Sequence, residues 1–352
     1  MHGAVKAAAH LLLEACGARL TGAVIRIECG GGVVWEEAFG RVDASASSPA
    51  VEVTTRFDLA SLTKPFVTAS ALRAVAEERL SLDGSFLALV PEWTRHAHAR
   101  ITLRSLLAHT SGMDSGADYR RLLGEDVEEF SLQQPLVAAP LARVIYSDLG
   151  FIALGVILAR AYGSSLSEIL ARTASEIGAK NTGYRPAAHE IPSIPATEED
   201  AWRGRVRGTV HDEKAHLMNG VAGHAGLFGT AADVAALTEA FLGPLCARGH
   251  RFLPAPLAHA AVVEQGSDAV LRRGLGWALK TSDANSCGAA MSRATFGHTG
   301  FVGTSVWADP LRDLSIVLLT NAVYFGRKDL RDLRAAVCDA VVGEMDRCAR
   351  SA

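Results

Sequence analysis

Residues 57–80, FDLASLTKPFVTASALRAVAEERL, place a lysine at the beginning of a long apolar helix. Apolar side chains recur at helical intervals after Ser61, which predicts a helix over 61–79 with one buried face. Pro65 is compatible with the first turn of that helix, whereas a proline deeper inside it would cost about 3 kcal/mol. Ser61 therefore belongs to the first turn, and Lys64 follows it directly before the proline.

Ser61 and Lys64 have the spacing of a nucleophile and its proton partner. Residues i and i+3 share one face of a helix, so their side chains can meet. A serine hydroxyl is a weak nucleophile until a base takes its proton, and a desolvated lysine with a lowered pKa is one such base. The helix N-terminus also offers N–H groups to a developing oxyanion. The alternative is a chance S-x-x-K in which the lysine extends to water.

Tyr146 precedes a strongly apolar segment, which predicts a helix over 147–162. A tyrosine in the loop that enters a helix can project into a cleft and relay a proton, provided that neighbouring cations lower its pKa. The alternative is a packed tyrosine whose hydroxyl is satisfied, with Asp148 as the helix N-cap.

A third motif lies in FGHTGFVGTSVWADP, residues 296–310, where His298, Thr299 and Gly300 end one predicted strand beside another. Gly300 permits a close approach of the backbone to a ligand. His298 and Thr299 are candidates to donate hydrogen bonds to a substrate carboxylate, or to tune Tyr146. The alternative is a hairpin turn that carries a surface histidine.

Strand patterns occur at both ends of the chain and helical patterns between them. Two strands surround a glycine turn in 21–40, and four more are predicted over 275–280, 294–300, 303–310 and 314–321. Further helices are predicted over 102–109, 165–177, 231–242 and from 330 to 348. Because unpaired strands must find partners, we expect one antiparallel sheet built from both ends, flanked by N- and C-terminal helices.

This layout predicts an α+β chain of two parts. Residues 1–60 and 225–352 would form a discontinuous sheet domain. Residues 61–224 would form a mainly helical insertion that includes a long ordered loop over 181–224. The cleft between the two parts is the expected ligand site.

Composition excludes several classes of function. The 352 residues are 49% hydrophobic and 21% charged with a formal net charge of −3, which points to no nucleic acid and no polybasic membrane contact. The six cysteines form no CxxC pair, so we expect free or buried thiols rather than a zinc site. No apolar run is long enough to span a bilayer.

The first residues, MHGAVKAAAHLLLEACGA, are compatible with an amphipathic helix or a lipoprotein signal. His10 and Glu14 interrupt the apolar run, which favours the helix. A cytoplasmic location is therefore expected, with a periplasmic one as the alternative.

The ordered set S-x-x-K, Y-x-[N/D] and [K/H]-T-G resembles the serine penicillin-recognising enzymes, and is most similar to the branch of class C β-lactamases, D,D-carboxypeptidases and related esterases. The resemblance extends through EERLSLDGSFLALVPEW, ITLRSLLAHTSGM, YSDLGFIALG and GVAGHAGLFGTAADVAAL, and thus from about residue 20 to 321. PATEEDAWRGRVRGTVHDEKA resembles the penicillin-binding-protein-4B-like members in particular.

The resemblance implies a β-lactamase-like fold and a role for each motif residue. Ser61 would be acylated, Lys64 would share or accept its proton, and Tyr146 would be the partner base in acylation and deacylation. The resemblance also implies that His298, Thr299 and Gly300 line the substrate on an edge strand. The backbone N–H groups of Ser61 and Phe301 would form the oxyanion hole.

Two positions depart from that family pattern. Asp148 stands where asparagine is frequent, and an ionised carboxylate accepts but does not donate. A carboxylate at position 148 should favour the ammonium form of Lys64, which moves the base role toward Tyr146. It should also disfavour β-lactams, whose side-chain amide carbonyl needs a donor. His298 replaces a lysine, and near its reference pKa of about 6.5 it is only partly charged at neutral pH, which weakens carboxylate capture.

Other polar groups have weaker interpretations. HDEKAH, residues 211–216, lacks the spacing of a metalloprotease motif, and the resemblance places His211 near the substrate pocket. His224 is either a cleft residue or a hydrogen-bonded structural histidine. The charge run at 198–200 is expected to be a solvated face.

We therefore expect a serine acyl hydrolase without a cofactor that acts on small-molecule or peptide substrates through an acyl-enzyme. D,D-peptidase or esterase activity is favoured, with weak or no β-lactamase activity. The alternatives are a β-lactamase, or a non-catalytic penicillin-binding-type module that holds peptide or cell-wall fragments. The oligomeric state is not predicted.

Overall fold

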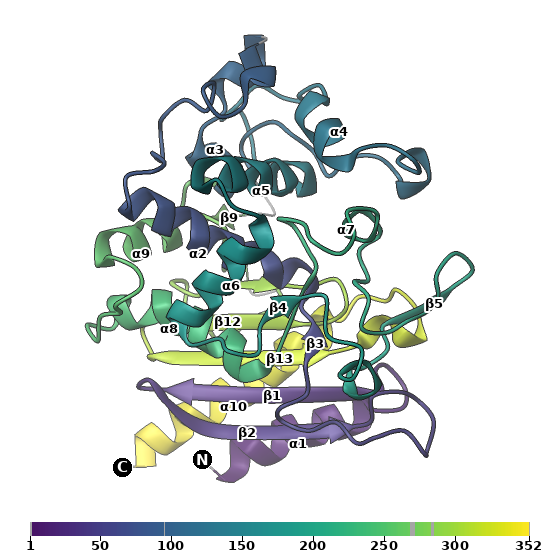
Figure 1. Ribbon diagram of the computed structural model, residues 1–352. Helices are drawn as coiled ribbons and strands as arrows, with labels where there is room; N and C mark the ends of the chain where they lie inside the picture. The colour runs from purple at the N-terminus through teal and green to yellow at the C-terminus, as the bar shows by residue number, and fades with distance from the viewer. Residues whose placement is uncertain (1, 95, 268–271, 283–284, 352) are drawn as a thin grey trace.

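A computed structural model describes residues 2–94, 96–267, 272–282 and 285–351. Its centre is an eight-stranded antiparallel sheet in the order β2-β1-β13-β12-β11-β10-β9-β8 (Figure 1). β1 (Gly22–Cys29) pairs with β2 (Gly32–Gly40) on one side and with β13 (Leu314–Thr320) on the other. Both ends of the chain thus build one sheet, as the strand patterns predicted. The remaining strands are β12 (Ser305–Asp309), β11 (Phe296–Thr299), β10 (Ala278–Leu279), β9 (Arg272–Arg273) and β8 (Gly266–Ser267).

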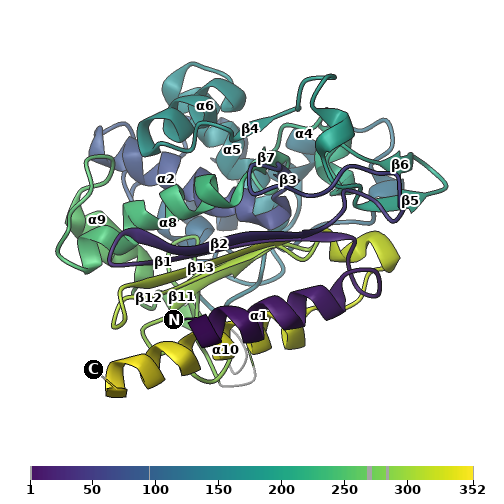
Figure 2. The same cartoon turned by 90° about the horizontal axis from the view of Figure 1, so that it is seen from below.

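Helices cover both faces of this sheet. α1 (His2–Ala15) and α10 (Arg331–Ser351) pack together on one face, and α8 (Ala231–Leu245) lies on the other (Figure 2). The N-terminal segment forms a helix packed on the sheet, with Ala8 and Leu12 fully buried. Location in the cell stays a prediction.

The middle of the chain is helical. α2 (Thr63–Ala76), α5 (Asp148–Tyr162) and α6 (Leu166–Ile177) pack against one another above the sheet. The shorter helices are α3 (Leu103–Leu107), α4 (Val127–Gln133) and α9 (Ala255–Val262). The capping box predicted from the spacing of Ser165 and Glu168 is present at the start of α6. One continuous apolar core joins these helices to α8 and to the inner face of the sheet.

The long loop over 181–224 is tied down by short elements. β4 (Gly183–Tyr184) joins β3 (Phe57–Asp58) and β7 (Leu227–Gly229) in a small sheet. β5 (Glu198–Asp200) and β6 (Gly204–Val206) form a hairpin, and α7 (Glu213–Leu217) follows. The division into domains at residues 60 and 225 stays a prediction.

Some predicted boundaries are wrong. A 3-10 turn over Ala60–Leu62 precedes α2, so the α-helix begins at Thr63 instead of Ser61. The strand predicted over 275–280 shrinks to β10 because Gly276 has a φ of +70°, which ends extended pairing. α4 and α9 were not predicted, since seven or eight residues show too little helical periodicity.

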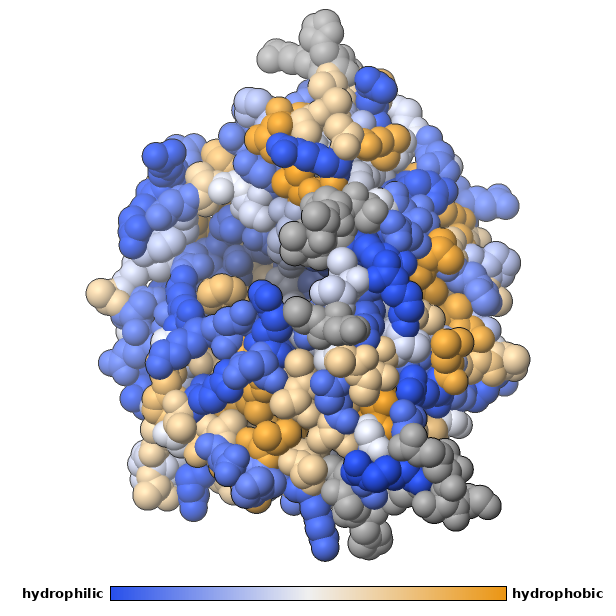
Figure 3. Space-filling model, turned by 180° about the vertical axis from the view of Figure 1, so that it is seen from behind, coloured by the Kyte–Doolittle hydropathy of each residue, from blue (hydrophilic) through white to orange (hydrophobic). Residues whose placement is uncertain are grey.

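A helix that crosses a membrane requires a minimum length and hydropathy. None of the described helices is by itself long and apolar enough to cross a membrane; α5 and α6 pass on length and composition only as a pair bent by 84°. The face opposite to that of Figure 1 is hollowed near its middle, and hydrophilic side chains border the hollow on the left of the view (Figure 3).

Candidate active site

Ser61 lies in the 3-10 turn between β3 and α2, next to a strained residue. Ala60 has a φ of +47°, a conformation that non-glycine residues adopt rarely and mostly at functional sites. Its N–H donates to the buried carboxylate of Asp58 at 2.8 Å, and the backbone N–H of His211 donates to the same carboxylate at 2.6 Å. Asp58 thus fixes the serine turn against the loop that carries His211.

Gly300 brings the end of β11 against this turn. A Cβ at that position would lie 2.1 Å from Thr304 Oγ1 and 2.8 Å from the carbonyl oxygen of Leu59. The hydroxyl of Thr304 donates to the same carbonyl at 3.2 Å. Only glycine therefore allows the strand end and the serine turn to approach this closely.

Lys64 is fully buried and uses its ammonium in three directions. Nζ donates to Ser61 Oγ at 3.1 Å, to Asp148 Oδ1 at 2.9 Å and to the carbonyl oxygen of His224 at 3.1 Å. A lysine ammonium has three protons, so this geometry satisfies all of them. The alternative in which Lys64 extends to water is wrong.

Lys64 carries a proton in the resting site. Burial alone would lower the pKa of Lys64, but the charges of Asp148 and Tyr146 outweigh burial and raise it above its usual value. The expectation of a lysine base with a lowered pKa is therefore wrong, whereas the expectation that Asp148 favours the ammonium is confirmed. Burial raises the pKa of Asp148, but Lys64 and the other neighbouring cations hold it below its usual value.

Asp148 is the first residue of α5, and Ser147 is its N-cap, with Oγ accepting from the N–H of Gly150 at 2.8 Å. The alternative that Asp148 caps the helix is therefore wrong. Its second oxygen, Oδ2, lies 3.3 Å from Nζ of Lys214. Asp148 thus binds one ammonium on each carboxylate oxygen.

Lys214 is a second cation bound to Asp148, and it was not predicted from the sequence. It is largely buried on α7, which Asp212 caps by accepting from the N–H of Ala215 at 2.9 Å. Asp212 also lies 2.7 Å from Nε2 of His224. His224 is therefore the hydrogen-bonded structural histidine of the two alternatives, and its carbonyl binds Lys64.

The ring of Tyr146 is enclosed by cations and imidazoles. Nζ of Lys64 lies 4.8 Å from the ring centroid, and the guanidinium of Arg273 lies 5.3 Å from it. The ring of His109 is 4.6 Å away and that of His298 is 6.3 Å away. Arg273 lies on the short strand β9 and carried no signal in the sequence. His109 lies in a stretch that resembles the family, but no role was predicted for it.

His298 is buried, with 2% of its surface exposed, and does not line the described hollows at Ser61. Burial, reinforced by the charges of Arg273 and Lys64, lowers the pKa of His298 well below its ordinary value. The expectation of a partly charged side chain is wrong, and so is the alternative of a surface histidine. Thr299, Gly300 and Phe301 do line the hollow, whereas His298 stands behind Tyr146.

This burial predicts a stability that depends on pH. The unfolded chain protonates His298 near its ordinary pKa of about 6.5, whereas the folded chain keeps it neutral to lower pH. The unfolded state then binds more protons, so the free energy of unfolding falls as pH drops below about 6.5, by roughly 1 kcal/mol per pH unit for such a histidine. His298→Asn should flatten this slope in urea titrations at pH 7.5, 6.0 and 5.0. An unchanged slope would show that His298 is protonated in the folded chain.

Two hollows meet at Ser61. One, of about 470 Å³, continues along Thr299 and Gly300 toward α10, and the other, of about 240 Å³, continues toward Asp148 and His211. Both are lined by Ser61, Tyr146, Phe301 and Arg327. Ser61 therefore faces two separate spaces.

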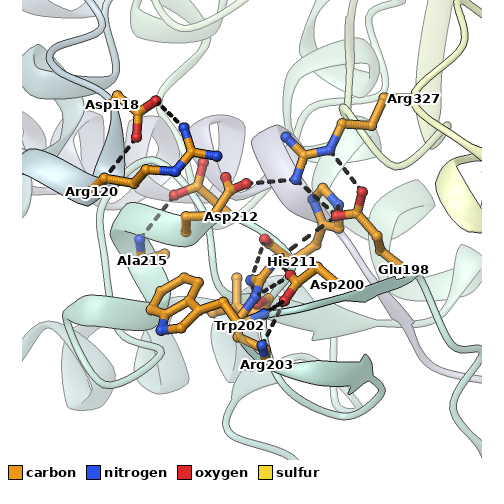
Figure 4. Close-up of polar contacts among 12 residues, drawn as sticks. Asp118, Arg120, Glu198, Asp200, Trp202, Arg203, His211, Asp212, Ala215 and Arg327 are labelled. Carbon is orange, nitrogen blue, oxygen red and sulfur yellow. Dashed lines mark hydrogen bonds and ion pairs between the residues drawn. The ribbon is translucent and has the colours of Figure 1, made fainter. Parts of the chain in front are cut away.

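Charged side chains close one wall of this cleft. Arg327 points toward Glu198, which it binds through Nε and Nη2, each at 2.8 Å (Figure 4). Glu198 also lies 2.9 Å from Nε2 of His211. The ring of Phe301 is 5.6 Å from that of His211. Glu198 is only 16% exposed and is paired with Arg327 and His211, so the prediction of a solvated face is wrong for it. His211 lines the smaller hollow, and its part in substrate binding stays a prediction.

Among the described residues, no group of three or more His, Cys, Asp or Glu side chains is arranged to hold a metal ion. The described cysteines Cys16, Cys29, Cys246, Cys287 and Cys338 are free thiols.

Known proteins resemble this chain in sequence and in fold. A family model described as Beta-lactamase matches residues 11–339. The esterase EstB of Burkholderia gladioli is 30% identical over 92% of this chain and 91% of that protein. A putative D-alanyl-D-alanine carboxypeptidase of Escherichia coli (strain K12) is 30% identical over 76% of this chain and 69% of that protein. The solved structure of EstCE1, a hydrolase with promiscuous acyltransferase activity, has the same fold, with a TM-score of 0.77, 24% identity and coverage of 97% and 99%.

Proposed function

Because the chain belongs to the beta-lactamase family and is a serine acyl hydrolase, we propose that Ser61 is its nucleophile, served by Lys64 and Tyr146. The observation that carries this assignment is the contact of 3.1 Å between Lys64 Nζ and Ser61 Oγ, beside a cleft that Tyr146 also lines. The contact satisfies the third proton of the buried ammonium and also holds the hydroxyl of Ser61 at the mouth of the cleft. It fits a proton pathway to the serine.

In the proposed acylation Tyr146 acts as a phenolate: Ser61 Oγ attacks the carbonyl carbon of the substrate while its proton passes to the phenolate oxygen of Tyr146. Lys64, already an ammonium, does not take this proton in the resting state but orients Oγ by hydrogen bonding. Lys64 and Arg273 beside the tyrosine ring stabilise negative charge on the phenol oxygen. The proton then passes to the leaving group as its bond to the carbonyl carbon breaks. Water repeats the sequence at the acyl-enzyme and releases the acid.

The oxyanion of each tetrahedral intermediate needs donors that are free to bind it. Among the described residues, the backbone N–H groups of Ser61 and Phe301 donate to no other group. Both residues line the two hollows that meet at the serine. These two N–H groups are our proposal for the oxyanion hole.

Substrate class follows from the charges beside the serine. Neutral, buried His298 offers no cation to a substrate carboxylate, and ionised Asp148 offers no donor to an amide carbonyl. Both favour a neutral ester or small amide over a β-lactam. A panel of chromogenic esters, D-alanyl-D-alanine peptides and penicillins tests this order. Faster turnover of a penicillin than of every ester would overturn it.

Asp148→Asn is expected to raise the rate of acylation by a fluorescent penicillin by about tenfold, because the amide supplies the missing donor. The same change removes the charge that raises the pKa of Lys64, and so frees its nitrogen as a base. Stopped-flow labelling at pH 7.5 measures the rate. Asp126→Asn, at the N-cap of α4, is the control for a general effect of losing a helix-terminal carboxylate. No rise in labelling would show that Asp148 does not limit β-lactam acylation.

A further inference from the structure

A third and larger hollow lies beside the active site. It has a volume of about 730 Å³ and is lined by residues of the 3-10 turn Tyr119–Arg121, of the β5–β6 hairpin and of α7. The rings of Tyr119 and Trp202 stack at 4.5 Å and 15° within this lining, and Trp202 keeps 37% of its surface exposed. Flat aromatic surfaces beside a concave space suit a ligand ring.

Two residues line both this hollow and the smaller one at Ser61. Only Arg327 and Glu213 line both of them among the described residues, and these two form an ion pair with Nη2 and Oε1 2.5 Å apart. Arg327 is anchored a second time by Glu198, and its guanidinium lies 5.7 Å from the ring of Phe301. The contact between these two side chains therefore forms part of the partition, together with the start of α7, where Asp212 lines the smaller hollow and Lys214 the larger one.

The ion pair between Arg327 and Glu213 breaks with a small loss of free energy. Arg327 is 42% exposed and Glu213 is 21% exposed, and an ion pair at that exposure stabilises a fold little. The pair of Arg327 with Glu198 does not have to break for Glu213 to move away. The arginine comes from the segment before α10 and the glutamate from α7, so the contact closes the cleft between two distant parts of the chain. The hollow behind it is about three times larger than the one it closes.

We propose that the ion pair between Arg327 and Glu213 sets the size limit for one substituent of the scissile carbonyl. With the pair closed, that substituent is confined to the hollow of about 240 Å³. With the pair removed, a substituent that carries an aromatic ring extends to the surface of Tyr119 and Trp202. This inference rests on the proposed acyl transfer at Ser61. It assigns Arg327 and Glu213 to substrate selection and leaves the bond-breaking steps unchanged.

Two series of esters test the proposal. One series varies the acyl group from acetyl to naphthoyl on a constant phenol, and the other varies the alcohol from phenol to a naphthyl-substituted phenol on a constant acetyl. The readout is the ratio of kcat/KM for the largest member to that for the smallest. Arg327→Ala and Glu213→Gln should each raise this ratio about tenfold in one series, because a pocket contact of this size discriminates by that order. The other series should change less than twofold, and the double variant should gain little over either single one.

Arg160→Ala is the matched control. Arg160 forms a two-point ion pair with Glu92, and its exposure is similar to that of Arg327. It lies about 18 Å from Asp148 along α5. Glu213→Gln retains the pair of Arg327 with Glu198 and decides the question if Arg327→Ala fails to fold. Ratios within twofold of wild type in both series, or equal rises in both, would overturn the proposal. Ser61→Ala, assayed alongside, separates the two claims. If Ser61→Ala is inactive but the ratios of the Arg327 and Glu213 variants do not change, only the size-limit proposal is wrong. If Ser61→Ala is active, the proposed function is wrong.

Discussion

Ser61→Ala is expected to lower kcat for ester hydrolysis by about 10⁴-fold or more, because the reaction loses the atom to which the acyl group is transferred. The folded structure should persist, since the Ser61 hydroxyl contacts only Lys64 among the described residues. Steady-state assays of purified wild type and variant, with matched thermal melts, measure both effects.

Ser70→Ala is the control for this comparison, because Ser70 lies on the same helix and its hydroxyl is buried against Phe66 and Thr173. It should lose some stability and keep its kcat within a few-fold. Substantial turnover by Ser61→Ala, in a sample free of wild-type enzyme, would place the nucleophile elsewhere.

Lys64→Met is expected to lower kcat by about 10³-fold and also to destabilise the fold by about 3 kcal/mol. The rate falls because Ser61 loses the group that orients it and the cation beside Tyr146. Stability falls because removing one partner of a buried ion pair leaves a buried charge, and here Lys214 compensates Asp148 only from the other oxygen.

Adding Asp148→Asn to Lys64→Met separates these two effects. The second change removes the uncompensated charge, so at least half of the lost stability should return in urea titrations while kcat stays low. If activity returned together with stability, Lys64 would be a structural residue, and the assignment of a proton pathway through it would be wrong.

The sequence predicted the parts of the site that local spacing determines. Ser61 and Lys64 meet because they lie one turn apart, and Tyr146 reaches the cleft because it precedes α5. The sheet built from both ends followed from the need of strands for partners. The need for glycine at position 300 was anticipated as a close backbone approach, although the partner proved to be the serine turn and Thr304.

The protonation states of the site residues depend on contacts between residues far apart in the sequence, which local spacing does not predict. Asp148 meets Lys64 across 84 positions of the chain, and this contact reverses the effect of burial on the pKa of the lysine. Lys214 on α7, Arg273 on β9 and His109 after α3 come from three further parts of the chain, and no role was predicted for them from their local sequence. His298 was expected at the cleft surface because its strand ends there, but alternation along β11 turns its side chain into the protein.

The account as a whole depends on an acyl group bound to Ser61. Its most direct test is to quench the enzyme with acid while it turns over a chromogenic ester, digest it and locate the added acyl mass by tandem mass spectrometry. We predict one acyl group per chain, on Ser61, lost on longer incubation and absent from Ser61→Ala. An acyl group on another residue, or full turnover without any trapped adduct in repeated quenches at burst times, would contradict the account.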